Sequence, residues 1–411
     1  LRKFNDKEAV TITGVIVGGP DKRSTFQKIK VKADGTDTVV LATIRPHLPY
    51  QYLDRVKITG KLESPMITEE FNYQDYLKKD GIYSVIDFPK IELLSQDHSC
   101  TPFSWAYEKI LFLKEHLQKS ITAQFGPEEN SIMEGIVLGT SKNMSEDLKD
   151  KFRSSGLSHI TAVSGSHIVI LAAVLMTSLL FFGLWRQQAF YVTTSLIWLY
   201  IILIGFPASG VRAAIMGSLF LLAQNIGRQN TSSHTMLLAG SAMLSLNPWL
   251  LFYDIGFQLS FLASLGIIHA KPLFDALFLK IHKISAIKYV TDILSVTISA
   301  QILTLPIIVY NFGNISTISL IANLLVLPII PFLMAFGFLA AFIGIGSHFL
   351  GWVFALPCNI LLSYFIFMLK FFYQPWAIIE IPSISPLWLG LYYPLAFFII
   401  FYLKKMTRRY F

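Results

Sequence analysis

The stretch Gly156-Leu-Ser-His-Ile-Thr-Ala-Val-Ser-Gly-Ser-His167 is polar and leads directly into a long apolar run. After it, apolar runs of bilayer-crossing length recur to the end of the chain, and one helical span needs about 20 residues. The runs cover roughly 167–185, 189–206, 211–226, 234–252, 254–270, 289–310, 315–345, 348–373 and 387–403. We therefore expect residues 161–411 to form a mainly α polytopic membrane helical bundle with eight or nine spans.

The composition agrees with a chain that lies mostly in lipid. Of the 411 residues, 53% are hydrophobic and 15% are charged, whereas a soluble domain carries about 25% charged residues. Residues 1–160 hold 22 Lys/Arg and 22 Asp/Glu, so the remaining 12 basic and 4 acidic residues, and the net charge of +8, belong to residues 161–411. The two cysteines, Cys100 and Cys358, lie far apart and predict neither a disulfide framework nor a zinc cluster.

Prolines interrupt several of the apolar runs. They are Pro207, Pro248, Pro306, Pro328 and Pro331. A broken helix at membrane depth is tolerated only where it is buried in protein or lines a water-filled cavity. The pattern therefore predicts a bundle with an internal cavity.

Residues 1–100 have a different pattern, in which short stretches of alternating apolar and polar residues are separated by turns. Five strands are expected, at Val10–Thr13, Phe26–Val31, Val39–Ile44, Val56–Gly60 and Ile82–Phe88. Such a set suits a small OB-like β-barrel. The fold class predicted for the whole chain is therefore a membrane helical bundle with a small N-terminal β-barrel (OB-like) domain.

Residues 101–160 change to a helical period and are expected to form amphipathic and juxtamembrane helices. Between residues 103 and 125, apolar side chains such as Leu117 and Ile121 fall on one face, which predicts an amphipathic helix on the bilayer surface. Ser131-Ile-Met-Glu134 has the spacing of a capping box and predicts a helix start there. A further short helix is expected from Ser145 to Arg153.

Basic residues in short loops predict the orientation of the bundle. The loop 271–288 carries four lysines against one acidic residue, and the tail 404–409 carries four more basic residues. We expect both to face the cytoplasm and the domain of residues 1–100 to be extracytoplasmic. Because the chain begins Leu-Arg-Lys without an initiator Met, we also expect it to be part of a longer protein.

The polar segment at the membrane entry also carries a resemblance to a known family. Residues 156–167 closely resemble the signature of ComEC-type competence proteins, the inner-membrane channels for transforming DNA in bacteria, although the family usually has Leu in place of Ser166. Further similar segments follow in order: Pro207-Ala-Ser-Gly-Val-Arg-Ala-Ala-Ile-Met216, Asn247-Pro248, Asp254-Ile-Gly-Phe-Gln-Leu-Ser-Phe-Leu-Ala263 and Ala322-Asn-Leu-Leu-Val-Leu-Pro328. Glu70-Phe-Asn-Tyr-Gln-Asp-Tyr-Leu77 resembles the family's OB-like domain, but Asn72 and Thr140 stand where the family usually has Asp.

The resemblance implies a multi-pass protein of the bacterial cytoplasmic (inner) membrane that conducts single-stranded DNA into the cytoplasm during natural transformation. It implies membrane lipid, a DNA receptor and a cytoplasmic ATPase as partners, and it leaves open a homo-oligomer. The chain has no Walker loop and no His-x-His-x-Asp-His cluster like that of the metallo-β-lactamase-like domain of full-length relatives. We therefore predict no metal, no cofactor and no enzymatic activity for this chain.

A channel for a strand that is charged at every nucleotide needs polar and positive side chains along its path. The candidates are polar residues in or beside apolar runs: His159, Ser164, His167, Arg212, Asp254, Gln258 and Asn323. Arg212 follows a Pro-Ala-Ser-Gly break, whose free backbone N–H groups suit an anion. Two interpretations stay open, in which Arg212 contacts phosphate or forms a structural ion pair with Asp254. For Gln258 and Asn323, hydrogen bonds between helices of about 0.6 kcal/mol are the commoner explanation.

Aromatic and basic residues lie close together in the sequence of the β-domain. The candidates for its binding surface are Phe26, Lys28, Lys30, Tyr73 and Tyr76. An OB surface binds single strands by aromatic stacking, worth about 1 to 3 kcal/mol per base, together with a basic groove. Residues 1–160 are neutral overall, however, so core aromatics and a solvated charged face are the alternative explanation.

Two other functions compete with DNA uptake. Ser164, Ser166 and His167 place hydroxyls beside an imidazole, as in an intramembrane protease, which would need a serine within about 2.6–3.2 Å of a base and an oxyanion hole. A secondary transporter of a small solute or lipid would use broken helices and a midplane Arg/Asp site equally well. Only the ordered resemblance favours the DNA channel over the transporter.

Overall fold

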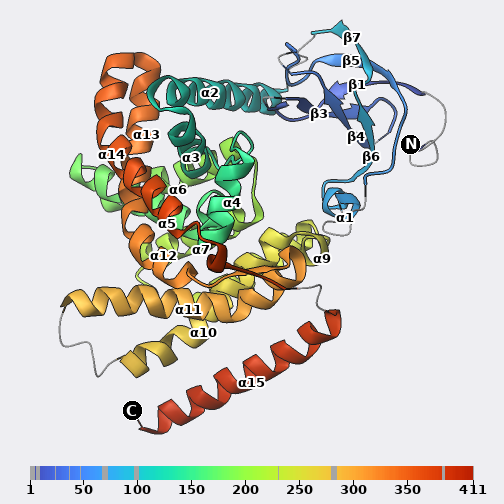
Figure 1. Cartoon of the computed structure of the whole chain (residues 1–411). Coiled ribbons are helices and arrows are strands. Elements are labelled where there is room, and N and C mark those ends of the chain that lie inside the picture. The colour runs from blue at the N-terminus through green and yellow to red at the C-terminus, as the bar shows by residue number, and fades with distance from the viewer. Residues whose placement is uncertain are drawn as a thin grey trace. The chain divides into compact units, whose positions relative to one another are not determined.

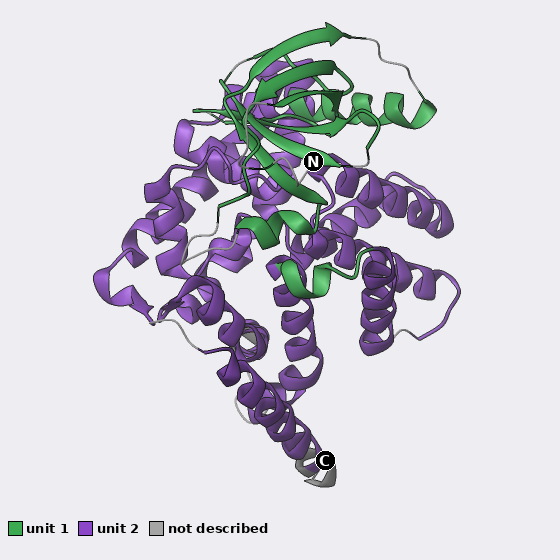
Figure 2. Ribbon diagram, turned by 90° about the vertical axis from the view of Figure 1, so that its right-hand side faces the viewer, with its two compact units in different colours: residues 1–115, 247–254 green, residues 116–246, 255–411 purple. Residues whose placement is uncertain are grey.

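The computed structural model describes residues 5, 10–23, 25–36, 38–46, 48–66, 73–96, 101–229, 231–278, 285–381 and 385–410, so Cys100 and residues 70–72 lie outside it. The chain is mostly helical, with a β-sheet near the N-terminus (Figure 1). Figure 2 distinguishes two compact units, of which unit 1 contains residues 1–115 and 247–254 and unit 2 contains residues 116–246 and 255–411. A short segment from the middle of the sequence therefore belongs to the N-terminal unit.

Unit 1 is built on a mixed seven-stranded sheet with the order β6-β4-β3-β1-β5-β7, in which β2 lies beside β3. The strands are β1 (Val10–Ile16), β2 (Asp21–Lys22), β3 (Gln27–Ala33), β4 (Val39–Ile44), β5 (Arg55–Gly60), β6 (Ile82–Asp87) and β7 (Lys90–Ser95). The five expected strands are confirmed, and β2 and β7 are additional. β6 and β7 end this order, so the pairings of the described strands form an open path and do not include the closure of a barrel.

Strand β3 has one buried and one more exposed face. Its apolar residues Ile29 and Val31 are buried in the core, whereas Lys28, Lys30 and Lys32 alternate with them and are half-buried or exposed. Side chains of a strand point to opposite faces with a period of two. One face of β3 therefore belongs to the core, and the other presents a row of lysines.

Helix α1 (Tyr73–Lys78) lies beside β6 and faces the core through Leu77, which packs with Leu41 and Ile82. The chain turns after α1 at Gly81, whose φ of 70° is a conformation that glycine adopts without strain. Helix α9 (Leu250–Tyr253) also belongs to unit 1 and contacts α1. The segment 247–254 therefore packs against α1 through α9.

Helix α2 (Pro102–Gln124) confirms that a helix forms over the predicted range, and Leu117 and Ile121 of its predicted apolar face are buried. Helix α3 (Pro127–Leu138) begins before Ser131, so the helix start predicted from the capping-box spacing is wrong. Pro127 occupies the first turn of α3, where its missing N–H costs no hydrogen bond. The Ser131 hydroxyl is inside the helix and donates to the Pro127 carbonyl at 2.9 Å.

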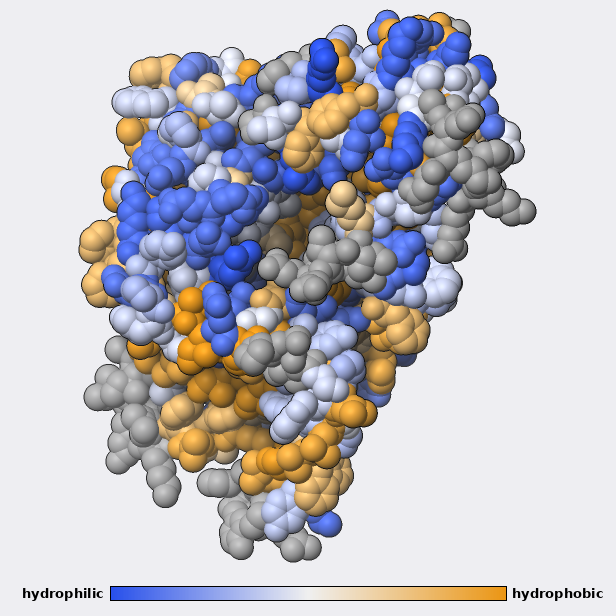
Figure 3. Space-filling view, turned by 45° about the vertical axis from the view of Figure 1, so that its right-hand side comes forward, coloured by the Kyte–Doolittle hydropathy of each residue, from blue (hydrophilic) through white to orange (hydrophobic). Residues whose placement is uncertain are grey.

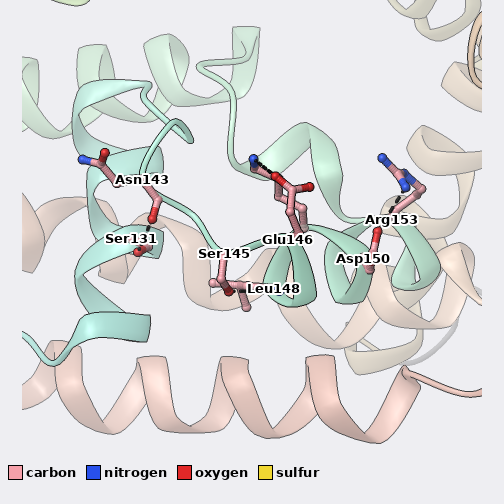
Figure 4. Close-up of polar contacts among 8 residues, drawn as sticks. Ser131, Asn143, Ser145, Glu146, Leu148, Asp150 and Arg153 are labelled. Atoms are coloured by element: carbon pink, nitrogen blue, oxygen red, sulfur yellow. Dashed lines mark hydrogen bonds and ion pairs between the residues drawn. The ribbon is translucent and has the colours of Figure 1, made fainter. Parts of the chain in front are cut away.

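Helix α4 (Glu146–Ser155) begins where the sequence predicts. The Ser145 hydroxyl caps it by accepting a hydrogen bond from the Leu148 N–H at 3.3 Å (Figure 4). Charged side chains on its surface form ion pairs within the helix, including Glu146 with Lys149 and Asp150 with Arg153 (Figure 4). Such pairs contribute about 0.3–0.5 kcal/mol each.

Unit 2 continues as a series of helices joined by short loops. They are α5 (Gly165–Phe181), α6 (Arg186–Ile204), α7 (Ala208–Asn225), α8 (Ser232–Leu246), α10 (Ile255–Phe278), α11 (Ser285–Phe312), α12 (Ser319–Val326), α13 (Ile330–Gly346), α14 (His348–Phe372) and α15 (Pro386–Tyr410), with a small sheet of β8 (Asn314–Ser316) and β9 (Ile378–Glu380). α10 packs along α11, and a Cβ at Gly266 would lie only 2.0 Å from the Ser299 carbonyl oxygen. Glycine therefore permits the close approach of these two helices.

Six segments of the described chain are long and apolar enough to cross a membrane. They are Arg186–Ile204, Ile255–Phe278, Lys288–Phe312, Ser319–Gly346, His348–Phe372 and Pro386–Lys405. The sequence predicts eight or nine spans, and this number stays a prediction. The runs at 167–185 and 234–252 form helices of 17 and 15 residues, which are not among these six segments. The run at 211–226 lies in α7, whose mean hydropathy is lowered by Arg212.

The outward faces of the unit 2 helices are rich in large apolar side chains. Exposed examples include Phe181, Leu387, Phe398 and Phe401, and Figure 3 shows hydrophobic residues over a broad area of the surface that it presents. A monomer in water rarely exposes more than a few hundred Å² of contiguous apolar surface. These faces therefore suit lipid as their surroundings.

Candidate functional site

The polar segment 156–167 joins α4 to α5 as a compact loop. Gly156 ends α4 with a φ of 72°, and a Cβ there would lie 2.4 Å from the Ser319 Cβ. Both the backbone conformation and the lack of space require glycine at this position. The next residues, Ser158–Ile160, form the 3-10 turn η2, in which His159 is exposed.

Ser164 and His167 close the first turn of α5. The Ser164 backbone N–H donates to Nδ1 of His167 at 3.1 Å, and the Ser164 hydroxyl lies 2.8 Å from the same nitrogen. Because a backbone N–H can only donate, Nδ1 is an acceptor and the ring proton is on Nε2. His167 is 1% exposed, and its Nε2 has no hydrogen-bond partner among the described residues. The imidazole therefore caps α5 and keeps one buried donor unused.

The protease alternative meets only one of its geometric conditions. The Ser164–His167 separation lies within the about 2.6–3.2 Å that a serine and its base require. A catalytic pair also needs a third group that orients the base and donors for an oxyanion. In the described chain the imidazole is oriented by its capping contact, and no acidic side chain bonds to Nε2. The arrangement is therefore that of a capping box.

Arg212 lies in α7 and is 8% exposed. Its Nε donates to the Ser260 hydroxyl at 2.6 Å and its Nη1 donates to the Ser264 hydroxyl, so two groups one turn apart on α10 hold the guanidinium. The Phe261 ring lies 5.7 Å from the guanidinium carbon. None of the ion pairs between described residues of unit 2 includes Arg212. This is unusual, because a buried charge is costly unless a counter-charge accompanies it.

The remaining end of the guanidinium faces the start of α5. A Cβ at Gly165 would lie 2.9 Å from Nη2 of Arg212, so glycine makes room for this end. The start of α7 is fixed to the same loop, since the Ser209 hydroxyl donates to the Val163 carbonyl at 2.6 Å. A helix N-terminus carries a partial positive charge, and no described group accepts a hydrogen bond from Nη2. An anion would complement both groups. We call Gly165, Arg212, Ser260 and Ser264 the Arg212 site.

The other candidates for the DNA path have separate surroundings. Asp254 is buried in unit 1, where its carboxylate pairs with Lys79 at 2.8 Å. Gln258 is half-buried on α10, and Asn323 is buried on α12 with no described partner for its Oδ1. Asp254 thus has an ion pair within unit 1, whereas Arg212 has neutral partners within unit 2.

In unit 1, four of the five surface candidates contact one another directly. The Lys28 ammonium donates to the Tyr73 hydroxyl at 3.0 Å and lies 5.6 Å from the centre of the Phe26 ring. The rings of Tyr73 and Tyr76 stack with centres 6.1 Å apart and planes 13° apart. The Lys79 ammonium follows, 4.2 Å from the centre of the Tyr76 ring. Rings and cations therefore adjoin one another from β3 across α1. We call Phe26, Lys28, Tyr73, Tyr76 and Lys79 the aromatic–basic surface.

Three further points concern the candidates predicted from sequence. Lys30, the fifth surface candidate, is exposed and pairs with Asp80 at 2.7 Å. Lys79 and Ser264 contact these candidates but are not among the residues predicted from sequence. Spacing is the signal that could have found them, because Lys79 follows Tyr76 by three positions and Ser264 follows Ser260 by four, as neighbours on one helix face do.

Comparisons with known proteins place the chain in a family. Residues 136–406 match the family model described as Competence protein. The chain is 26% identical over 321 residues to ComE operon protein 3 of Bacillus subtilis (strain 168), and the match covers 77% of this chain and 38% of that relative. The chain therefore spans well under half the length of the curated relative. No solved structure matches the chain.

Proposed function

The chain belongs to the competence protein family, and from this premise we propose that unit 2 forms part of a channel that conducts single-stranded DNA across the bacterial cytoplasmic membrane during natural transformation. Six helices of the described chain are long and apolar enough to cross a membrane, and together with the family they support a multi-pass membrane protein. The observation that carries the proposal is the Arg212 site, in which a buried guanidinium has neutral partners and an unused donor at a helix N-terminus.

The Arg212 site suits a phosphate that passes through. A DNA phosphate loses part of its hydration inside a membrane protein, and donors of the channel have to replace the water. Nη2 of Arg212 and the N-terminus of α5 would supply such donors, and hydrogen bonds to charged groups are worth about 1.5–3 kcal/mol. Conduction also requires that binding be weak enough for the ion to leave. Hydroxyl partners leave the positive charge available without holding phosphate permanently.

We propose that unit 1 receives the strand on the extracytoplasmic side. Bases would stack on the Tyr73 and Tyr76 rings, and the neighbouring lysines would contact phosphates. The basic loop of residues 271–288 and the basic tail then face the cytoplasm. A DNA receptor would deliver the strand, a cytoplasmic ATPase would supply energy, and a second copy of the chain would complete the channel.

The decisive experiment separates uptake from surface binding. A strain that lacks this gene is complemented with the wild type or with Arg212→Ala, and labelled DNA is measured outside and inside the cells. We expect about 100-fold less internalised DNA for Arg212→Ala, because two charge-assisted hydrogen bonds at about 1.5 kcal/mol each are lost. Surface-bound DNA and the amount of membrane-inserted protein should stay normal.

Arg228→Ala is the matched control, because Arg228 lies just beyond the end of α7 and is exposed. It should import DNA as the wild type does. Arg212→Lys keeps the positive charge in case Arg212→Ala does not fold, and it should retain part of the uptake because lysine cannot make the forked contacts. Normal uptake by folded Arg212→Ala would contradict the proposal.

A further inference from the structure

Lys79 connects the aromatic–basic surface to a second feature of unit 1. Its ammonium lies against the Tyr76 ring and pairs with the Asp254 carboxylate at 2.8 Å. The two side chains are 16% and 10% exposed, which makes this the least exposed ion pair among the described residues of unit 1. Solvent therefore screens this pair less than the others.

Two more contacts hold the Asp254 segment on the turn after α1. The Asn247 side chain donates to the Lys79 carbonyl at 3.0 Å. The Lys78 ammonium lies 5.3 Å from the centre of the Tyr253 ring, within the range of a cation–π interaction. The segment that holds the Asp254 carboxylate beside Lys79 is thus fixed at Asn247 and at Tyr253.

The Asp254 carboxylate offers Lys79 the same kind of partner as a phosphate group would. Burial lowers the pKa of Lys79, but Tyr76 and Asp254 together raise it above its ordinary value, so Lys79 is a cation at neutral pH. A carboxylate and a phosphate both offer negatively charged oxygens to an ammonium. Lys28, the other lysine of the surface, has a neutral phenol as its described hydrogen-bond partner. The surface therefore has an acidic occupant at its Lys79 end.

We infer that Lys79 is a phosphate subsite of the aromatic–basic surface and that Asp254 occupies it as an internal substitute for phosphate until single-stranded DNA displaces it. This inference rests on the proposed function, because it takes the surface as a site for single strands. It adds Lys79 to the residues that bind the strand, and it adds Asp254 as a group that competes with the phosphate. Binding of DNA and the Lys79–Asp254 pair exclude each other.

Asp254 is also the last residue of the segment 247–254 of unit 1. Asp254 directly precedes Ile255, the first residue of α10. α10 carries Ser260 and Ser264, the hydroxyls that hold the Arg212 guanidinium. The pair with Lys79 is one of three described contacts that hold the segment directly before this helix.

The test measures binding of a fluorescent 12-nucleotide oligo-dT to the purified full chain in detergent. Asp254→Asn keeps the shape of the side chain and removes the charge that competes with phosphate. We expect about fivefold tighter binding, since a partly buried ion pair is worth about 1 kcal/mol. The slope of log K against log salt should become steeper by about 0.7, because no freed carboxylate then offsets the contact of Lys79 with phosphate.

Asp34→Asn is the matched control, because it removes the same charge from an ion pair of unit 1, here with Arg55 at 2.6 Å. It should change affinity less than Asp254→Asn does. Lys79→Gln should weaken binding and reduce the salt slope, and adding Asp254→Asn to it should then have no further effect. This variant provides a result even where Asp254→Asn does not fold.

Three results would decide the inference. Unchanged or weaker binding by folded Asp254→Asn overturns it, as does a Lys79→Gln variant with the affinity and salt slope of the wild type. If Tyr76→Ala weakens binding while Asp254→Asn has no effect, only the phosphate subsite fails. If neither the wild type nor Asp254→Asn binds the oligonucleotide, the proposed role of the whole surface fails.

Discussion

The aromatic–basic surface and the Arg212 site use positive charge in different ways. On the surface, Lys28 and Lys79 lie against aromatic rings and have described acceptors in a phenol and a carboxylate. At the Arg212 site, the cation is buried and its described oxygen partners are hydroxyls. Near the surface, water can solvate a charge that loses its partner. A buried guanidinium has no such replacement, so its stability depends on the protein groups around it. Substitutions should therefore have larger effects at the Arg212 site.

Gly165→Ala offers the strongest test of this difference apart from replacing Arg212 itself. The added Cβ would lie 2.9 Å from Nη2, so the guanidinium has to move from the start of α5. We expect about tenfold less internalised DNA, because a small displacement of a charge-assisted donor costs much of its interaction energy. The internalised fraction of labelled DNA measures this effect.

Gly217→Ala is the control for Gly165→Ala. Gly217 lies in α7, and a Cβ there meets no atom within 4 Å. Uptake should stay normal in this variant, since alanine fits a helix at least as well as glycine. Equal uptake by Gly165→Ala and Gly217→Ala, at equal protein levels, would show that the position of the guanidinium is not critical.

Tyr76→Ala should have an intermediate effect on the binding of oligo-dT by the full chain. The substitution removes a ring that is 41% exposed and that stacks on Tyr73. We expect about fivefold weaker binding, which corresponds to the loss of about 1 kcal/mol of base stacking. Tyr76→Phe should bind normally because it keeps the ring, and Tyr83→Ala, on β6, is the control. A loss of binding by Tyr76→Phe would assign the effect to the hydroxyl.

Lys30→Ala should have the smallest effect. Lys30 and Asp80 are 45% and 38% exposed, and such a pair contributes about 0–1 kcal/mol. Oligo-dT affinity should fall less than about twofold at physiological salt and be unchanged at high salt, where exposed charges are screened. Lys90→Ala, which breaks the exposed pair with Glu92, is the control. If Lys30→Ala lost as much affinity as Tyr76→Ala, the difference between the aromatic–basic surface and the Arg212 site would be contradicted, since an exposed cation would then behave like a buried one.

Local patterns in the sequence predict most helices and strands of the fold, but not every residue at which they begin or end. The strands, the amphipathic helix α2 and the cap at Ser145 depend on neighbours a few positions away. The helix start at Ser131 is predicted wrongly because proline at position 127 provides an earlier start. The eight or nine spans stay a prediction: six helices of the described chain have the length and hydropathy of a span, and α5 and α8 are helices of 17 and 15 residues.

The sites depend on contacts that sequence patterns do not contain. Arg212 and Asp254 stand out as charges in apolar runs, and their residue types suffice to select them. Their partners come from distant segments, because Ser260 is 48 positions from Arg212 and Lys79 is 175 positions from Asp254. Only the folded chain joins such pairs, so the pairing of Asp254 with Lys79 could not be predicted.

The long separation between Lys79 and Asp254 has a consequence for biosynthesis. The β-sheet of unit 1 is translated early, but the segment 247–254 leaves the ribosome only after α2 to α8 have been made. Closing a loop of this length also carries an entropic cost that grows with the logarithm of its length. Unit 1 therefore cannot be completed during its own synthesis, and its last contacts wait for the chain that enters the membrane in between.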